Sequence, residues 1–182
     1  MPMPPLRRSR ARCFALTLLT AALLMASCGG GGPEPEPSAT PAPTAGASVV
    51  QIFLHSGNPN DCSEVTGVDR EVEGDPTLEK AMSALMAGPT EDEKAGGLGG
   101  WFDEKTKDML ISAEIVDGVA EADFRDLREV IPNASSSCGS AQLLAQLDGT
   151  ARQFDEVDRT LYSINGDAGT FYEWLQLPVP DA

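Results

Sequence analysis

The chain has 182 residues and a formal net charge of −15, with 28 acidic residues against 13 Lys and Arg. This charge disfavours nucleic acid and anionic lipid headgroups as partners, and it favours cationic partners or divalent cations. The length suits a single domain with a sizeable core and some additional chain.

The first 27 residues have the pattern of an export signal. They contain four basic residues, namely Arg7, Arg8, Arg10 and Arg12. An apolar stretch follows up to Ala26, shorter than the ~20 residues that a membrane-spanning helix needs, which argues against a retained anchor. The rest of the chain therefore carries nine basic and 28 acidic residues, a net charge of −19.

The residues Met25-Ala26-Ser27-Cys28 resemble a bacterial lipobox, in which an aliphatic residue and two small ones precede a modified cysteine. The resemblance implies cleavage before Cys28, lipidation of Cys28 and stable attachment to the membrane. The alternative is ordinary secretion with Cys28 as a free thiol, which is a liability outside the cell.

Residues 28–48 are predicted to form a disordered tether. The segment is rich in Gly and Pro and holds too few apolar groups to offset the entropy of ordering. Its Pro-x-Pro repeats could instead be a recognition motif, although a spacer fits the composition better.

Two cysteines remain in the exported chain, Cys62 and Cys138. Outside the cytoplasm such a pair is most simply a disulfide, which we predict here. A nucleophilic cysteine is the alternative, but His55 is the only histidine and no Cys–His spacing motif is visible.

The first predicted elements are a strand over Val49–His55, an edge strand over Val65–Val72 and a helix after them. Asp75 is expected to be the N-cap of this helix, with Pro76 at its first position. The helix has one apolar face and is expected to close at Gly88 in the left-handed conformation.

A hairpin follows around Asp117-Gly118, a pair that suits a type I′ turn. This turn pairs Val116 with Val119. It then places Ile115 opposite Ala120, Ala113 opposite Ala122 and Ile111 opposite Phe124, and these six residues share one apolar face. The opposite face places Glu114 across from Glu121 and is expected to face water.

A second helix begins at the serine-rich segment near Cys138, and a last strand covers Val157–Asn165. The order indicates an α+β fold: a single β-α-β-β-α-β domain over residues 49–166, with helices on one face of a mixed sheet. Gly96 to Trp101, GGLGGW, is predicted to be a flexible connection.

This pattern resembles the sporulation and spore germination domain, often called GerMN, from about residue 49 to 166. The resemblance rests on LMAGPT, IVDGVAEADF, SAQLLAQLDGTARQF and VDRTLYSING, in this order behind a lipobox and a Pro-rich stalk. It implies an exported or lipid-anchored protein similar in fold to ring-building modules of secretion and sporulation complexes. The motif residues look structural, so the resemblance implies no catalytic site.

The chain departs from that pattern by its C-terminal tail, residues 167–182. Four apolar residues there, Phe171, Tyr172, Trp174 and Leu175, either fold back onto the domain or form an interaction surface. Folding back is the interpretation that we favour.

The leading hypothesis is a non-enzymatic module that binds an unidentified envelope protein, with no cofactor, no metal site and no nucleic acid. A carboxylate-dependent wall hydrolase is the first alternative; its candidates are Asp103, Glu104, Glu114, Glu121 and Asp123. Weak binding of divalent cations is the second, at Glu91 to Glu93 and at Asp103-Glu104.

Overall fold

The computed structural model describes residues 46–58 and 60–180. Cys28, the export segment 1–27 and the tether as far as residue 45 lie outside the described residues. None of the helices in the described part has the length and apolar character needed to cross a membrane.

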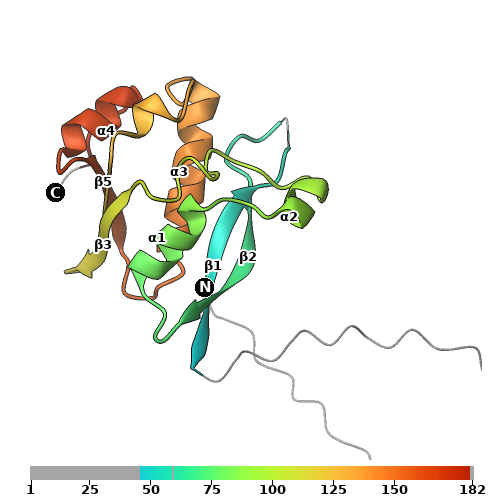
Figure 1. Cartoon of the computed structure of the whole chain (residues 1–182). Helices are drawn as coiled ribbons and strands as arrows, with labels where there is room; N and C mark the ends of the chain where they lie inside the picture. Colours follow the sequence, from blue (N-terminus) through green and yellow to red (C-terminus); the bar gives the residue numbers. More distant parts are fainter. Residues whose placement is uncertain (1–45, 59, 181–182) are drawn as a thin grey trace, which may run out of the picture. The chain divides into compact units, whose positions relative to one another are not determined.

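The described residues form strands and helices in alternation (Figure 1). The strands are β1 (Ala47–His55), β2 (Val65–Glu73), β3 (Leu110–Val116), β4 (Val119–Phe124) and β5 (Arg159–Ile164). The helices are α1 (Leu78–Met86), α2 (Glu91–Ala95), α3 (Ser137–Ala151) and α4 (Ala168–Trp174), with a 3-10 turn at Leu127–Glu129.

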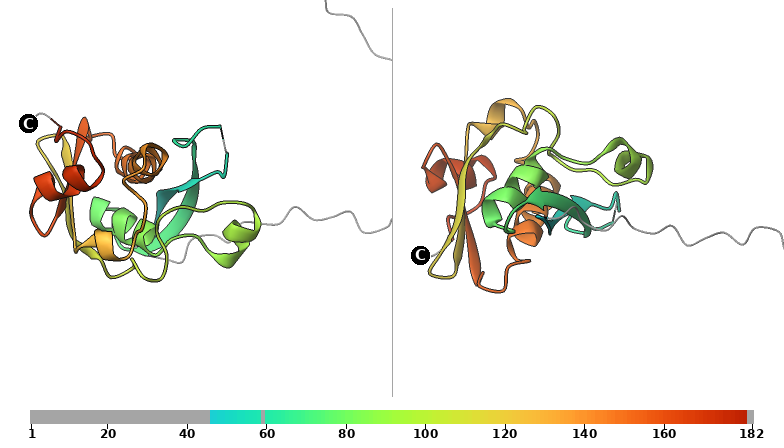
Figure 2. Two further views of the ribbon diagram at one scale, coloured as in Figure 1. Left: turned by 90° about the horizontal axis from the view of Figure 1, so that it is seen from above. Right: turned by 60° about the horizontal axis from the view of Figure 1, so that its bottom comes forward.

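The α+β class is confirmed, but the strands lie in two sheets instead of one. β1 and β2 form an antiparallel pair, while β3, β4 and β5 form a mixed sheet in that order. Helices α1 and α3 lie between the two sheets (Figures 1 and 2). β2 is a full partner of β1 over nine residues, longer than the predicted edge strand.

Both sheets and three of the helices contribute to one apolar core. Its largest fully buried side chains include Ile52, Leu54, Met82, Leu85, Met86, Phe102, Phe124, Leu127, Ile131, Leu143, Tyr162 and Phe171. The apolar face predicted for α1 is buried as expected. Burial of this set is the main favourable contribution to folding.

Helix α1 begins two residues later than expected. Its N-cap is Thr77, whose side chain accepts a hydrogen bond from the Lys80 amide at 3.3 Å, so the predicted cap Asp75 is wrong. Its end is as predicted, because Gly88 has φ +76°. A Cβ at Gly88 would also lie 2.3 Å from the Phe102 carbonyl oxygen. Position 88 therefore requires glycine both for its positive φ and for this close contact.

The β3–β4 hairpin has the predicted turn and, over most of its length, the predicted register. Asp117 and Gly118 have φ 49° and 80°, as a type I′ turn requires. A register shift between Ser112 and Leu110 then places Leu110, not Ile111, opposite Phe124. The predicted inward position of Ile111 is therefore wrong, and its side chain is 46% exposed.

The C-terminal tail forms α4 and packs into the core. Phe171, Tyr172 and Leu175 are buried, so these three residues do not form the interaction surface that was one reading of the tail. The Phe171 ring lies 5.4 Å from that of Tyr162 and 6.0 Å from that of the partly buried Trp174. Folding back, the reading favoured from the sequence, is what the structure has.

The predicted disulfide between Cys62 and Cys138 is present, with a Cα–Cα distance of 5.4 Å. It joins the loop after β1 to the first turn of α3, across 76 residues of sequence. In the chain-entropy model a loop of this size gives a stabilisation of about 4 kcal/mol.

The register shift yields a testable contrast between neighbouring residues. Leu110→Asp should lower the free energy of unfolding by about 2 kcal/mol or more, because it places a carboxylate against the core. Ile111→Asp should cost less than about 1 kcal/mol, because that side chain is already in water. Urea denaturation of both variants measures the difference, and equal losses would contradict the observed register.

Candidate functional site beside strand β3

The free edge of β1 is closed by polar side chains of α3 and of the turn that follows it. Gln153 bonds both backbone groups of Gln51, with its Oε1 2.7 Å from the amide nitrogen and its Nε2 2.7 Å from the carbonyl oxygen. Thr150 accepts from the Phe53 amide at 3.1 Å. These side chains occupy the place of a neighbouring strand, so the edge has no backbone groups left at these positions for another chain.

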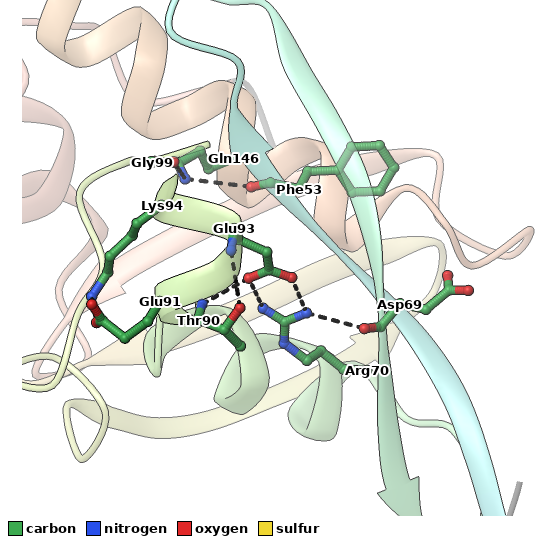
Figure 3. A network of polar contacts seen from close by, with 9 residues as sticks. All are labelled: Phe53, Asp69, Arg70, Thr90, Glu91, Glu93, Lys94, Gly99 and Gln146. Atoms are coloured by element: carbon green, nitrogen blue, oxygen red, sulfur yellow. Dashed lines mark hydrogen bonds and ion pairs between the residues drawn. The ribbon is translucent and has the colours of Figure 1, made fainter. Parts of the chain in front are cut away.

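Gln146, one turn before Thr150, connects three segments. Its side chain donates to the Phe53 carbonyl at 3.4 Å (Figure 3). It also accepts from the Trp101 amide at 3.1 Å. The Gly99 backbone continues the closure by pairing with His55 in both directions, at 2.8 and 2.9 Å. Gln146 is fully buried, so each bond satisfies a group that has no access to water.

The segment Gly96 to Trp101 is therefore held in place and is not the flexible connection predicted. Gly100 has φ +155°, and a Cβ there would lie 2.0 Å from Nε2 of Gln146. Glycine at this position allows the close approach of backbone and side chain that Gln146 needs.

The acidic segment Glu91 to Glu93, a candidate for cation binding, has a structural role. Arg70 holds Glu93 through two bonds of 2.7 and 2.6 Å, and Glu93 completes a capping box with Thr90 (Figure 3). The hydrogen bond from Arg70 lowers the pKa of Glu93. Glu91 pairs with Lys94 at 2.8 Å. In the described part of the chain, no three His, Cys, Asp or Glu residues are grouped as metal ligands.

The five hydrolase candidates are dispersed. Glu104 pairs with Lys107 beside the exposed Asp103. Glu114 and Glu121 face each other across the hairpin, as predicted, and both are exposed. Asp123 accepts bonds from the Ser163 hydroxyl at 2.7 Å and the Gly166 amide at 2.8 Å, so it fixes the turn after β5.

The edge of β3 differs from that of β1, because no strand pairs with its outer side in the described sheet. In an antiparallel ladder, residues that exchange both backbone bonds alternate with residues that exchange none. The two-residue turn makes Val116–Val119 a bonded pair, so Ala113 and Ile115 are in non-bonded pairs. Their amide and carbonyl groups therefore point to the open side of β3.

Two adjoining hollows lie along this edge, between β3 and α1, and they share Glu79; we call them together the β3 groove. The first, of about 360 Å³, is lined by Pro76, Thr77, Leu78, Glu79, Ala113, Glu114, Ile115, Phe154 and Glu156. The second, of about 620 Å³, is lined by Glu79, Lys80, Ser83, Lys107, Asp108, Leu110, Ile111 and Arg125.

The two halves of the β3 groove differ in charge. The first half combines an apolar floor, including Ile115 and Phe154, with the carboxylates of Glu79, Glu114 and Glu156. The second half has three basic side chains, but each is engaged by its own chain. Lys80 donates to two carbonyls at 2.6 Å, Lys107 pairs with Glu104, and Arg125 donates to the Asp108 carbonyl at 3.3 Å.

Among the residues of the first half, sequence reasoning named only Glu114 as a functional candidate, and as a catalytic one. Glu79 is in the first turn of α1 and Glu156 is in the connection between α3 and β5, and only the fold brings them together. Strict alternation along the strand predicted that Ile111 faces the core. The bulge reverses the direction of its side chain, and the sequence pattern does not reveal a bulge.

A family profile described as "Sporulation and spore germination" (Germane) matches residues 53–170, well over half of the chain. It starts within β1 and ends in α4, so it covers both sheets and the β3 groove. No curated protein matches the chain.

The chain is similar to several solved structures at low sequence identity. The tandem GerMN domains of the sporulation protein GerM from Bacillus subtilis are 18% identical, with a TM-score of 0.48, over 72% of this chain and 43% of that one. This chain thus spans less than half of that protein's length. The first GerMN domain alone is 16% identical, with a TM-score of 0.43, over 66% and 84%. A candidate lipoprotein of Clostridium perfringens is 19% identical, with a TM-score of 0.40, over 70% and 81%.

The closure of β1 can be tested at Gln146. Gln146→Leu should lower the free energy of unfolding by about 3 kcal/mol, because it leaves buried backbone groups without partners. The control is Gln142→Leu, one turn earlier and only half-buried, which should change stability by less than about 0.5 kcal/mol. Thermal unfolding followed by circular dichroism compares the two, and an unchanged Gln146→Leu midpoint would refute the role of this side chain.

Proposed function

Because the chain belongs to the sporulation and spore germination family, we propose that it is a lipid-anchored, non-enzymatic module of the bacterial cell envelope that binds another protein. Lipidated Cys28 holds it at the membrane, the segment between Cys28 and the start of β1 acts as a tether, and the folded domain reaches its partner outside the cytoplasm. The β3 groove is the binding surface.

The single observation that carries the binding role is the contrast between two sheet edges. The protein closes the backbone of β1 with Gln146, Thr150 and Gln153. Beside β3, by contrast, it leaves outward backbone groups next to a groove with an apolar floor. Open edges are a hazard that proteins normally block, so an open edge lined by a groove favours a role in binding.

A hydrolase finds less support in the same geometry. A general acid and its partner must flank one bond in a shared cleft. The five candidates instead lie in separate places: Asp123 accepts hydrogen bonds, Glu104 is in an ion pair, and the Glu114–Glu121 pair is exposed on the sheet surface.

The anchor is tested at the lipobox. Cys28→Ala should abolish incorporation of a fatty-acid label and leave the protein unprocessed or released from the membrane. Metabolic labelling of cells that express either form measures this. Cys62→Ala is the matched control, because it removes a cysteine of the disulfide and should keep the label. Equal label on wild type and Cys28→Ala would refute lipid anchoring.

Binding through the β3 groove is tested by photocrosslinking of the full chain in its native envelope. A photoreactive amino acid replaces either Ile111, in the groove, or Val49, on β1; each side chain is 46% exposed. Position 111 should form a discrete adduct with another protein, and position 49 should not. No adduct at position 111, or the same adduct at both, would contradict the proposed role.

A further inference from the structure

We propose that the β3 groove takes an extended cationic segment of a partner protein, which adds to β3 as a further strand. This inference rests on the proposed function and specifies the chemistry of the partner. It commits to a backbone pairing mode and to the sign of the partner's charge.

The pairing mode follows from the backbone of β3. Ala113 and Ile115 direct their amide and carbonyl groups to the open side, and both line the groove. An incoming extended strand bonds to such groups at every second residue. The side chains of that strand point alternately into the groove and into water. Main-chain bonds therefore supply affinity, and the pocket supplies selectivity.

The second wall of the groove is α1. Leu78 and Glu79 of this helix line the first hollow opposite the segment from Ala113 to Ile115. Lys80 and Ser83 line the second hollow with Leu110 and Ile111. An edge strand with a helix beside it forms a slot for one extended chain. The floor at Leu78, Ile115 and Phe154 is apolar, which suits apolar side chains at alternate positions of that chain.

The charge of the occupant follows from which groove charges are already paired. The basic side chains of Lys80, Lys107 and Arg125 are bound by groups of their own chain. Four carboxylates of the groove have no ion-pair partner within residues 46–58 and 60–180: Asp108 in the second hollow, and Glu79, Glu114 and Glu156 in the first. The last three leave the first hollow with a net negative charge, which Lys or Arg of an incoming segment complements.

The chain's own segments are poor occupants. Residues 28–48 contain two glutamates, no Lys or Arg, and five prolines, which lack the amide that pairing needs. A second copy pairing through its own β3 would bring Glu114 of both chains together, a like-charge contact between two strongly acidic proteins. A cationic segment of a different protein meets neither obstacle.

The test uses the full exported chain purified in detergent and a fluorescent nine-residue peptide of alternating Lys and Val. Fluorescence anisotropy should show saturable binding that weakens as salt rises. The same peptide with Glu in place of Lys should not bind. Hydrogen exchange should show slower exchange of the Ala113 and Ile115 amides when the Lys–Val peptide is present.

Two controls separate strand addition from electrostatic adsorption. The variant with Glu79→Gln, Glu114→Gln and Glu156→Gln should bind about tenfold more weakly, at roughly twofold for each exposed ion pair. Its match, with Glu71→Gln, Glu129→Gln and Glu173→Gln, changes the net charge equally at exposed sites that do not line the groove and should bind as wild type.

Backbone methylation of the peptide provides the second control. Methylation of one alternate set of amides should abolish binding, while methylation of the other set should leave it, because only one set faces β3. Equal binding of both methylated peptides, or equal loss in both triple variants, would overturn strand addition. So would a concentration-dependent dimer that excludes the peptide, because β3 would then pair with a second copy.

The outcome is distinguishable from that of the proposed function. A photoadduct at position 111 together with no binding of the Lys–Val peptide would keep the groove as a binding surface and reject the cationic strand. Absence of the adduct would count against the proposed function itself.

Discussion

The closure of the β1 edge by α3 is the constraint on which the rest of the structure depends. A strand edge buried against a helix must find partners for its amide and carbonyl groups, since each unsatisfied group costs about 1–3 kcal/mol. Gln146 and Thr150 supply those partners from one side of the helix, one turn apart, and Gln153 supplies them from the turn that follows it. The helix is thereby bonded to the strand as well as packed on it.

This closure removes the outer edge of β1 as a place where the other strands could add. In the described residues, β3, β4 and β5 form a separate sheet. Phe53 shows how close β1 and α3 lie: a Cβ at Gly149 of α3 would be 2.7 Å from its ring. Glycine weakens a helix by about 1 kcal/mol relative to alanine, and at this position that loss permits the contact.

The same network of polar contacts also holds the long connection between α1 and β3 in place. Gln146 bonds the Trp101 amide, Gly99 pairs with His55, and Arg70 holds Glu93 of α2. The connection is thus bonded to the β1–β2 sheet at two points and to α3 at a third. The opposite sheet ends in the open edge of β3, so the ordered polar bonds and the candidate binding surface lie on different sheets.

The sequence by itself determined the elements whose causes are local. The Asp117-Gly118 turn, the closing Gly88, the apolar face of α1 and the Cys62–Cys138 pair were all predicted, because turn chemistry, helical periodicity and cysteine number are readable along the chain. The tertiary structure alone decided the split into two sheets, the bulge that exposes Ile111 and the meeting of Glu79, Glu114 and Glu156 in one groove. Each of these depends on contacts between residues far apart in sequence. A buried glutamine such as Gln146 reads as an ordinary polar residue until the strand whose backbone it satisfies is placed beside it.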